Sequence, residues 1–530
     1  MPQRNLLGFT RLNHMINHQI SRKVKRPKGY DNSPYDVVLA NGRVIDPETK
    51  LDAVRNVGIK NGKIAAVSPT ALKGQVVVDA TGLVVAPGFI DWHAHGQNTL
   101  ADRVQAFDGV TTALELEAGM LPIGRWYDLQ ARSKRILNYG ASSSWGIARM
   151  VTLEGIPLPV EPRAQALFAN FGLTKWPNDI ATPEQVAAIV NLTERGLKEG
   201  GLGVGVVPGY APGSGYKELL AVHTLAAKYK VPTYSHVRSE GDVDPLSAAQ
   251  AYGEVLSFAA ATGANVHICH LNSTSFRDMT LAVPMIRRAL EQGLNITVEA
   301  YPYGAASTAI GAKFLAPENL SRIGMTYESV EYQGKRLNQS SFKELRAKNP
   351  GATVVVHFYE LPRDQKLLDM ALLFSGGIIA SDAMPWLSTT TGQEIDPNAW
   401  PLPDDAFAHP RSAGTFTRFL AQYVRDRKLI NWPDAIAKAS YLPAKYLEDT
   451  ARQMKKKGRV QVGTDADIVV FDPATVQDRA TYEQPNQLSV GMRDVLVNGM
   501  FVIRDGEVDK KAFPGKPVRR SATASAAAAN

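Results

Sequence analysis

Short apolar runs broken by Asn-Gly pairs occupy both ends of the folded body. They lie in 35–88 and again in 459–510, as "YDVVLANGRVID", "VGIKNGKIAAV", "ADIVVFDP" and "VLVNGMFVIRDGEV". Asn-Gly between apolar runs is a strong signal for a β-hairpin. The two distant segments therefore predict one small β-sandwich domain built from both ends of the chain.

Between these segments, residues 89–458 alternate strand-like and amphipathic helical runs, such as "YKELLAVHTLAAKY" and "TLAVPMIRRALEQG". The strand-like runs are "VVAPGFIDWHAH", "VTTALELEAG", "SSSWGIARM", "LGVGVVPGY", "VPTYSHVRS", "ANVHICHLN", "NITVEAYPYG" and "GGIIASDAM". Eight β/α units predict an α/β fold, a (β/α)₈ TIM barrel inserted into the small domain. A further run, "ATVVVHFYE", has no place in this scheme, and 310–350 is interpreted as an insertion or long loops.

The distribution of charge changes this picture little. The net charge is +8, but residues 1–34 contribute +6 and residues 511–530 contribute +4, so the body carries about −2. A nucleic-acid groove needs its positive charge on the folded body, which argues against nucleic-acid binding. We expect a basic flexible tail at 1–34 and a disordered tail at 511–530, where the sequence is of low complexity.

Compartment and membrane association follow from what the composition lacks. No apolar run reaches the roughly 18 residues of a membrane span, and the N-terminal segment shows no compact apolar stretch of a secretory signal. The single cysteine, Cys269, excludes an internal disulfide and fits a reducing compartment. We therefore expect a cytoplasmic protein without a membrane span.

Polar residues that bind metals cluster at the predicted carboxyl ends of the barrel strands, where barrels of this type carry their chemistry. Two histidines one residue apart on a strand share a face. Strands one, two, five, six and eight supply His93, His95, Glu115, Glu117, His236, His270 and Asp382. Such nitrogen and oxygen donors suit zinc or a similar divalent ion, singly or as a pair.

Several motifs carry a family resemblance over about residues 35–508. "GFIDWHAH", "GVTT" and "GTDADIVVFDP" resemble the amidohydrolase superfamily, and "AYPYGAAST", "SHVRSEGD", "SDAMP" and "HPRSAGTF" resemble its N-acyl-D-amino-acid deacylase (D-aminoacylase) branch. The resemblance implies metal-dependent hydrolysis of a small-molecule amide, and barrels of this superfamily often associate, so a homo-oligomer is possible.

The resemblance also assigns roles residue by residue. It implies that His93 and His95 bind at one metal position, and that His236 and His270 bind at the other. Asp382 matches the strand-eight aspartate, which ligates metal and acts as the general acid and base. The residues that match those holding the substrate near its carboxylate are Tyr301, Ser307 and Arg411.

Two positions depart from the branch. Where the deacylases carry a cysteine ligand after strand two, this chain has Ala118, and Cys269 does not replace it because it lies on strand six. Glu117 and Glu115 remain, and Glu117 is favoured because it is nearer the barrel mouth. The branch's lysine two residues after the strand-six histidine is Asn272 here, which puts a free N-acyl-D-amino acid in question.

The expected function is hydrolysis of a non-peptide amide bond by metal-activated hydroxide, most directly of an N-acyl amino acid, with Asp382 as acid and base. A cyclic-amide hydrolase (hydantoinase or dihydroorotase type) or a deaminase on the same scaffold is the alternative. A non-catalytic scaffold is disfavoured because the histidines and Asp382 are all present. The Trp- and Pro-rich run 383–408 is interpreted either as the wall of an acyl pocket or as a surface loop.

Overall fold

The central body is a barrel of eight parallel strands, seen in a computed structural model that describes residues 33–163 and 165–521. In ring order the strands are β6 (Phe89–Asp91), β7 (Val110–Met120), β8 (Asn138–Ser144), β9 (Val204–Val206), β10 (Pro232–Ser235), β11 (Asn265–Ile268), β12 (Ile296–Ala300) and β17 (Ile378–Ile379). Just beyond the two end strands, the Ala383 amide donates to the His93 carbonyl and the His95 amide to the Ala383 carbonyl. The predicted (β/α)₈ barrel is confirmed.

Helices follow the strands around the ring. They are α2 (Thr99–Phe107), α3 (Ile123–Arg132), α4 (Trp145–Glu154), α7 (Pro183–Lys198), α8 (Tyr216–Tyr229), α9 (Ala248–Thr262), α11 (Met279–Glu291) and α13 (Gln365–Leu372). Their ends follow local rules: α7 begins with a Thr182–Gln185 capping box and Pro183, and α9 stops at Gly263 with a positive φ of 70°. Within the described residues, no helix combines the length and apolarity needed to cross a membrane.

The third strand lies earlier than the sequence predicted. We expected it over 142–150, but β8 ends at Ser144 and α4 begins at the next residue. The Ser144 side chain accepts a hydrogen bond from the Ile147 amide and so caps the helix. The apolar run "WGIARM" is therefore a buried helix, which short apolar runs do not distinguish from a strand.

The small domain is a nine-stranded sheet that joins the two ends of the chain. Its strands are β1 (Tyr35–Asp46), β2 (Leu51–Lys60), β3 (Lys63–Ser68), β4 (Gly74–Asp79), β5 (Val84–Pro87), β20 (Ile468–Phe471), β21 (Met492–Val497), β22 (Met500–Arg504) and β23 (Glu507–Val508). Strand β5 pairs with both β1 and β20, which places the N- and C-terminal segments in one sheet. Leu39, Val57, Ile468 and Leu496 share its core.

Two of the three Asn-Gly pairs form the predicted hairpin turns, between β2 and β3 and between β21 and β22. At Asn61-Gly62 and Asn498-Gly499 both residues have positive φ, as a tight hairpin turn requires. The first pair, Asn41-Gly42, lies inside the continuous strand β1, where the pairing with β2 shifts between Leu39 and Gly42. It is a β-bulge, and the predicted turn there is wrong. A side chain at 42 would meet Val85 Cγ2 at 2.5 Å.

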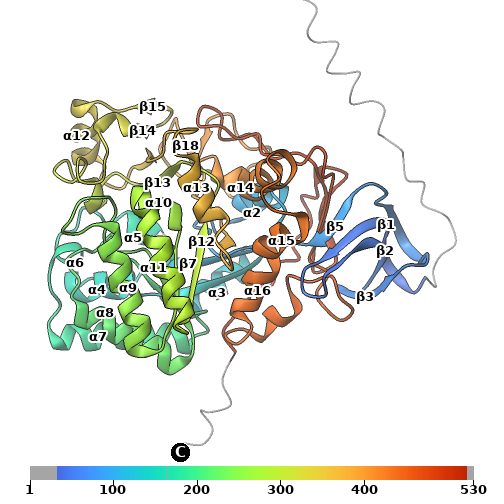
Figure 1. Cartoon of the computed structure of the whole chain (residues 1–530), viewed down its shortest axis with the longest axis horizontal. Coiled ribbons are helices and arrows are strands. Elements are labelled where there is room, and N and C mark those ends of the chain that lie inside the picture. The colour runs from blue at the N-terminus through green and yellow to red at the C-terminus, as the bar shows by residue number, and fades with distance from the viewer. Residues whose placement is uncertain (1–32, 164, 522–530) are drawn as a thin grey trace, which may run out of the picture.

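The unassigned run "ATVVVHFYE" belongs to a small accessory sheet. Strand β16 (Thr353–His357) pairs with β13 (Ala305–Ala309) and β14 (Val330–Tyr332), and β15 (Lys335–Arg336) completes the sheet. Helix α12 (Gln339–Lys348) lies in the same insertion (Figure 1). Because β13 follows β12 directly, this sheet holds Ser307 near the mouth of the barrel.

The C-terminal segment is ordered further than expected. The prediction of disorder from 511 is wrong for residues 511–521. The Val518 amide donates to the Tyr139 carbonyl at 2.7 Å, and the Tyr127 hydroxyl donates to the Val518 carbonyl at 2.6 Å. Val518 is buried in a cluster with Trp92 and Leu202 inside the barrel, so apolar burial orders a segment that composition marked as a tail. The predictions of tails at 1–32 and 522–530 concern residues outside the described part of the chain.

Candidate metal centre

His93 and His95 follow β6 and are both buried at the carboxyl end of the ring. Their Nε2 atoms lie 3.2 Å apart. The Nδ1 atom of His95 lies 2.7 Å from Glu115 Oε2, and that of His93 is within hydrogen-bond distance of Glu299 Oε1. An ionised carboxylate only accepts, so each Nδ1 carries the proton and each Nε2 offers a lone pair to the same point. Two lone pairs this close need a cation or a proton between them.

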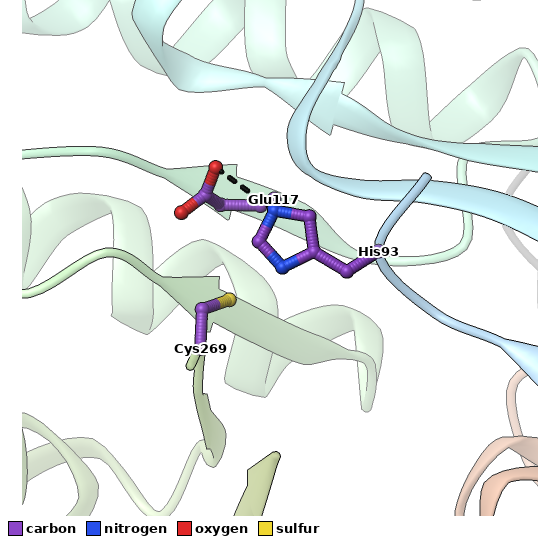
Figure 2. A group of neighbouring side chains, drawn as sticks. All are labelled: His93, Glu117 and Cys269. Atoms are coloured by element: carbon purple, nitrogen blue, oxygen red, sulfur yellow. Dashed lines mark ion pairs between the residues drawn. The ribbon is translucent and has the colours of Figure 1, made fainter. Parts of the chain in front are cut away.

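Glu117 connects the two histidine pairs. Its Oε2 lies 3.2 Å from His93 Nε2, as Figure 2 shows, and 3.6 Å from His95 Nε2. Its Oε1 lies 2.8 Å from His270 Nε2. Glu115, the other strand-two candidate, faces the outer side of His95. Of the two glutamates, Glu117 therefore occupies the position of a bridging ligand and Glu115 that of an orienting carboxylate.

Asp382 reaches the cluster from the end of strand eight. Its Oδ1 lies 3.4 Å from His93 Nε2 and 3.3 Å from His95 Nε2, and its Oδ2 lies 2.8 Å from Arg411 Nη2. Asp382 and His270 have φ values of 52° and 31°, in the left-handed region that L-residues other than glycine rarely adopt. Such backbone conformations persist where the surrounding fold imposes them, often at functional sites.

His236 completes the set from strand five. One ligand atom from each of Glu117, His236 and His270 lies within 4.8 Å of the others, and the same holds for His93, His270 and Asp382. The fold therefore brings together every residue that the sequence suggested as a ligand. Two overlapping groups of three match the size of a centre for one or two ions.

The electrostatics of the cluster favour a cation. Burial lowers the pKa of His93, but Asp382, Glu117 and Glu299 together outweigh it and raise that pKa well above its usual range. Burial also lowers the pKa of His95, but Glu115 and Asp382 outweigh it and raise that pKa to about 9, whereas burial lowers the pKa of His236 to about 4. The carboxylates thus hold positive charge at this point, and a divalent ion supplies it in place of protons. The donor set fits zinc, which accepts imidazole nitrogen and carboxylate oxygen.

Cys269 lies at the barrel-interior side of the cluster. Its Sγ and one donor atom each of His93 and Glu117 lie within 4.8 Å of one another (Figure 2). The side chain is also part of the buried group that includes Trp92 and Tyr234. Burial and the nearby Glu299 raise the pKa of this thiol well above its usual range. The structure thus places Cys269 closer to the centre than its position in the sequence indicated.

Glu299 is the residue that the sequence analysis missed. Besides His93, it contacts His267 Nε2, at 3.1 Å from its Oε2. Burial raises the pKa of Glu299, but His93 and His267 outweigh burial and lower it well below its usual range. Glu299 is the last residue but one of β12, in "NITVEAYPYG", so the search for polar residues near strand ends that found the other residues also points to it.

Arg411, Tyr301 and Ser307 meet beside Asp382. The Arg411 guanidinium lies over the Tyr301 ring, 4.6 Å from its centroid, and donates to the Ser307 carbonyl at 3.3 Å. Arg411 Nη1 and Ser307 Oγ are buried without a hydrogen-bond partner in the described part of the chain. Asn272 donates to the Tyr301 and Tyr303 carbonyls, so it braces the loop after strand seven.

Two cavities meet at the centre. The inner cavity, of about 30 Å³, lies on the side of strands four to seven and is lined by His236, Glu240, Phe276, Ser307, Phe314 and Asp382, among others. The outer cavity, of about 290 Å³, is lined by His95, Met120, Trp126, Leu129, Glu161 and Glu394, among others. Only Glu394 and Pro397 of the run 383–408 line the outer cavity, whereas Trp386 is buried in the core and Trp400 stacks on Phe107.

The fold and the site together define the class of this protein. It is a (β/α)₈ barrel with a histidine–carboxylate centre at the ends of its strands. The sequence profile of the amidohydrolase family matches residues 76–280 and 272–503, and the chain belongs to this family. The resemblance seen in the motifs is therefore confirmed.

The chain is similar over most of its length to two curated proteins of Alcaligenes xylosoxydans xylosoxydans. It is 26% identical to a D-aminoacylase, over 92% of this chain and 98% of that protein. It is 27% identical to an N-acyl-D-glutamate deacylase, over 92% and 97%.

Among solved structures, an N-acyl-D-glutamate deacylase from Bordetella bronchiseptica, complexed with zinc and a phosphonate inhibitor, has a TM-score of 0.73 and 23% identity, covering 92% of this chain and 99% of that one. A dihydropyrimidinase from Brevibacillus agri has a TM-score of 0.54 and 17% identity, covering 91% and 98%. These likenesses support the fold.

Proposed function

We propose that this protein is a zinc-dependent hydrolase that cleaves the amide bond of an N-acyl-D-amino acid. One observation carries the choice of substrate: Arg411 Nη1 and Ser307 Oγ are buried donors without a partner, directly beside Asp382. Buried donors of this kind are costly unless a ligand satisfies them, and a carboxylate accepts from both. The full-length similarity to D-aminoacylase and N-acyl-D-glutamate deacylase supports the same choice.

The residues that hold zinc in this proposal are those that converge at the barrel mouth. His93, His95 and Asp382 serve one position, His236 and His270 serve the other, and Glu117 lies between both. A bound zinc ion lowers the pKa of a water molecule and polarises the amide carbonyl. One or two ions suit this donor set.

Asp382 moves the proton. Its carboxylate accepts the proton of the attacking water as the new C–O bond forms, and returns it to the nitrogen as the C–N bond breaks. Arg411 holds the other Asp382 oxygen at 2.8 Å and fixes its orientation. The products are a carboxylic acid and a D-amino acid, so atoms and charge balance.

The lining of the inner cavity favours a substrate whose amino-acid part carries an apolar side chain. Beyond Ser307 and the metal-centre residues, its lining is dominated by apolar side chains and contains no lysine: Phe276, Phe314, Leu315, Ile323, Met325, Val356 and Phe358. Glu240 lies in the same cavity, and burial with the nearby Glu117 raises its pKa well above the usual range. An acidic side chain finds no cation there, so we expect D-alanine or D-leucine derivatives to be preferred over D-glutamate derivatives.

The test combines metal analysis with a substrate panel. We expect bound zinc, chelator-sensitive hydrolysis of N-acetyl-D-alanine and N-acetyl-D-leucine, and far slower hydrolysis of the L-forms and of N-acetyl-D-glutamate. Asp382→Asn should fold and lower turnover by about 10²–10⁴-fold. Ring opening of hydantoins or release of ammonia, with no deacylation, would identify a cyclic-amide hydrolase or a deaminase instead.

Other aspects of the function stay predictions. The body's slight negative charge supports the absence of nucleic-acid binding, and the single cysteine supports a cytoplasmic location. A homo-oligomer is expected only from the family. Sedimentation analysis tests the oligomeric state directly.

A further inference from the structure

The outer cavity adjoins the centre on the side away from the Arg411–Ser307 pair. His95 lines the outer cavity and Asp382 lines the inner one, and their nearest side-chain atoms are 3.3 Å apart. Ser307 belongs to the inner cavity. An amide that is cleaved at the centre, with its carboxylate at Ser307 and Arg411, therefore directs its acyl part into the outer cavity. This step rests on the proposed function.

The volume of the outer cavity far exceeds the volume of an acetyl group. The cavity's volume is about 290 Å³, whereas a cavity of about 10–15 Å³ is enough to hold one water molecule. The inner cavity has 30 Å³. This asymmetry favours substrates with a compact amine part and an extended acyl part.

The wall of the outer cavity combines apolar and polar side chains. Met120 and Trp126 are buried apolar residues at the end of β7 and in α3, and Leu129 lies one turn further along α3. Side-chain amides follow: Gln97 and Gln130 both accept hydrogen bonds from Arg135 Nη1, at 3.0 Å and 2.8 Å, which fixes this part of the wall. An acyl chain in this cavity thus meets both apolar and polar groups.

The lining of the outer cavity carries an unbalanced negative charge. Glu161 and Arg163 form an ion pair at 2.8 Å. Glu394, which also lines the cavity, forms neither a hydrogen bond nor an ion pair through its carboxylate within the described residues. Burial raises the pKa of Glu394, and Arg163 lowers it only in part. A partly desolvated carboxylate in the wall of a cavity is complementary to a cation.

We propose that the outer cavity binds the acyl part of the substrate, and that this acyl part is extended and ends in an ammonium group that faces Glu394. An ω-aminoacyl group has this chemistry. Glu394 and Leu129 are then specificity-determining residues, and neither belongs to the metal centre.

The experiment compares two acyl groups of equal length on one amine. N-(4-aminobutanoyl)-D-alanine and N-pentanoyl-D-alanine differ by an ammonium in place of a methyl group. We expect the wild-type zinc enzyme to favour the cationic substrate about tenfold in kcat/KM. Glu394→Gln should remove this preference, because kcat/KM falls further for the cationic substrate than for the neutral one. Glu483→Gln, which alters a carboxylate that lines a different surface cavity, is the control and should leave the preference intact.

A second variant tests the location independently of charge. Leu129→Trp fills the outer cavity from a half-buried helix position. It should lower kcat/KM about tenfold for the pentanoyl substrate and leave N-acetyl-D-alanine unchanged. An equal loss for both substrates, or no preference for the cation in the wild type, overturns the inference.

Failure of the proposed function is distinguished by binding. If the zinc protein hydrolyses neither substrate, calorimetric titration with the same pair measures their relative affinity in the wild type and in Glu394→Gln. A preference for the cationic compound that Glu394→Gln removes supports the outer-cavity assignment and overturns only the deacylase activity. Equal affinities overturn the assignment itself.

Discussion

Glu299 orients His93 without belonging to the set of donors that face the ion. Its carboxylate accepts from His93 Nδ1 and also contacts His267, so it determines which ring nitrogen faces the centre. Glu299→Gln keeps the shape but removes the charge. We expect zinc affinity to fall by about 10–100-fold, measured by competition with a chromogenic chelator.

The matched control is Glu331→Gln, another buried carboxylate that contacts a histidine, His357, away from the centre. It should bind zinc as the wild type does. Unchanged affinity in Glu299→Gln would show that His93 is oriented by other contacts.

At the residue scale, the sequence indicated the candidate metal ligands better than the residues that orient those ligands. His93, His95, His236, His270 and Asp382 were found because each ends a strand, and strand ends meet at one mouth. Glu115 and Glu117 share a strand face, so alternation alone does not separate them. The pairing of β7 with β8 shifts beyond Glu115, and no sequence pattern marks this irregularity, which accompanies the approach of Glu117 to His93 and His270 while Glu115 contacts the other side of His95.

At the element scale, the loop after β9 passes against His236 at a glycine. A Cβ at Gly209 would lie 2.5 Å from His236 Nδ1 and 2.7 Å from the Val237 carbonyl oxygen, closer than real contacts allow. Gly209→Ala should therefore displace His236 and lower both zinc content and turnover by more than about tenfold. Metal analysis of the purified variant, together with its circular dichroism, measures this.

Gly253→Ala provides the comparison. Gly253 lies inside helix α9, where an added Cβ meets only Met285 Cε at 3.8 Å. This substitution should stabilise the protein by about 0.5–1 kcal/mol through helix propensity and leave zinc content unchanged. Full zinc content in Gly209→Ala would mean that the loop, rather than the histidine, moves aside.

Helices and strands were predicted well where a repeating pattern extended over many residues. They were predicted poorly where a single contact decided between two local structures. The eight-fold alternation is enough for a barrel. Ser144, by capping α4, ends the third strand earlier than its apolar continuation indicates. Gly42 sits against Val85 from a strand 43 residues further along the chain, so the choice between turn and bulge depended on a distant partner.

At the scale of the whole molecule, a charged network joins the small domain to the barrel. Arg459 Nε lies 2.7 Å from Glu48 Oε2, and Arg459 also contacts Glu448. The Arg459 hydrogen bond outweighs burial and, with Gln461, lowers the pKa of Glu48 to about 2. Because the folded-state pKa is lowered, this stabilisation is present above the unfolded pKa near 4.5 and is lost as the pH falls toward 2.

Glu48→Gln should therefore lower the free energy of unfolding at pH 7 by about 0.2–1 kcal/mol, since Glu48 is about one third exposed. The difference between wild type and variant should shrink as the pH falls from about 4.5 to 2. Urea unfolding at a series of pH values measures it, and a difference that stays constant across this range would contradict the role of the carboxylate charge.

The C-terminal segment closes the end of the barrel opposite the centre. Val518 is 1% exposed and packs with Trp92 and Leu202, while its backbone bonds to Tyr139 and Tyr127. Val518→Asp buries a carboxylate without a partner and should lower the free energy of unfolding by about 3–5 kcal/mol. Thermal and urea unfolding, with zinc content measured in parallel, test whether this closure supports the barrel.

Val462→Asp is the matched control, because Val462 is 65% exposed in a turn of the small domain. It should change the free energy of unfolding by less than about 0.5 kcal/mol. If Val518→Asp is equally mild, the segment 511–521 docks on a barrel that is already stable. If it unfolds the protein or empties the centre of zinc, the last described residues of the chain are part of the folded core.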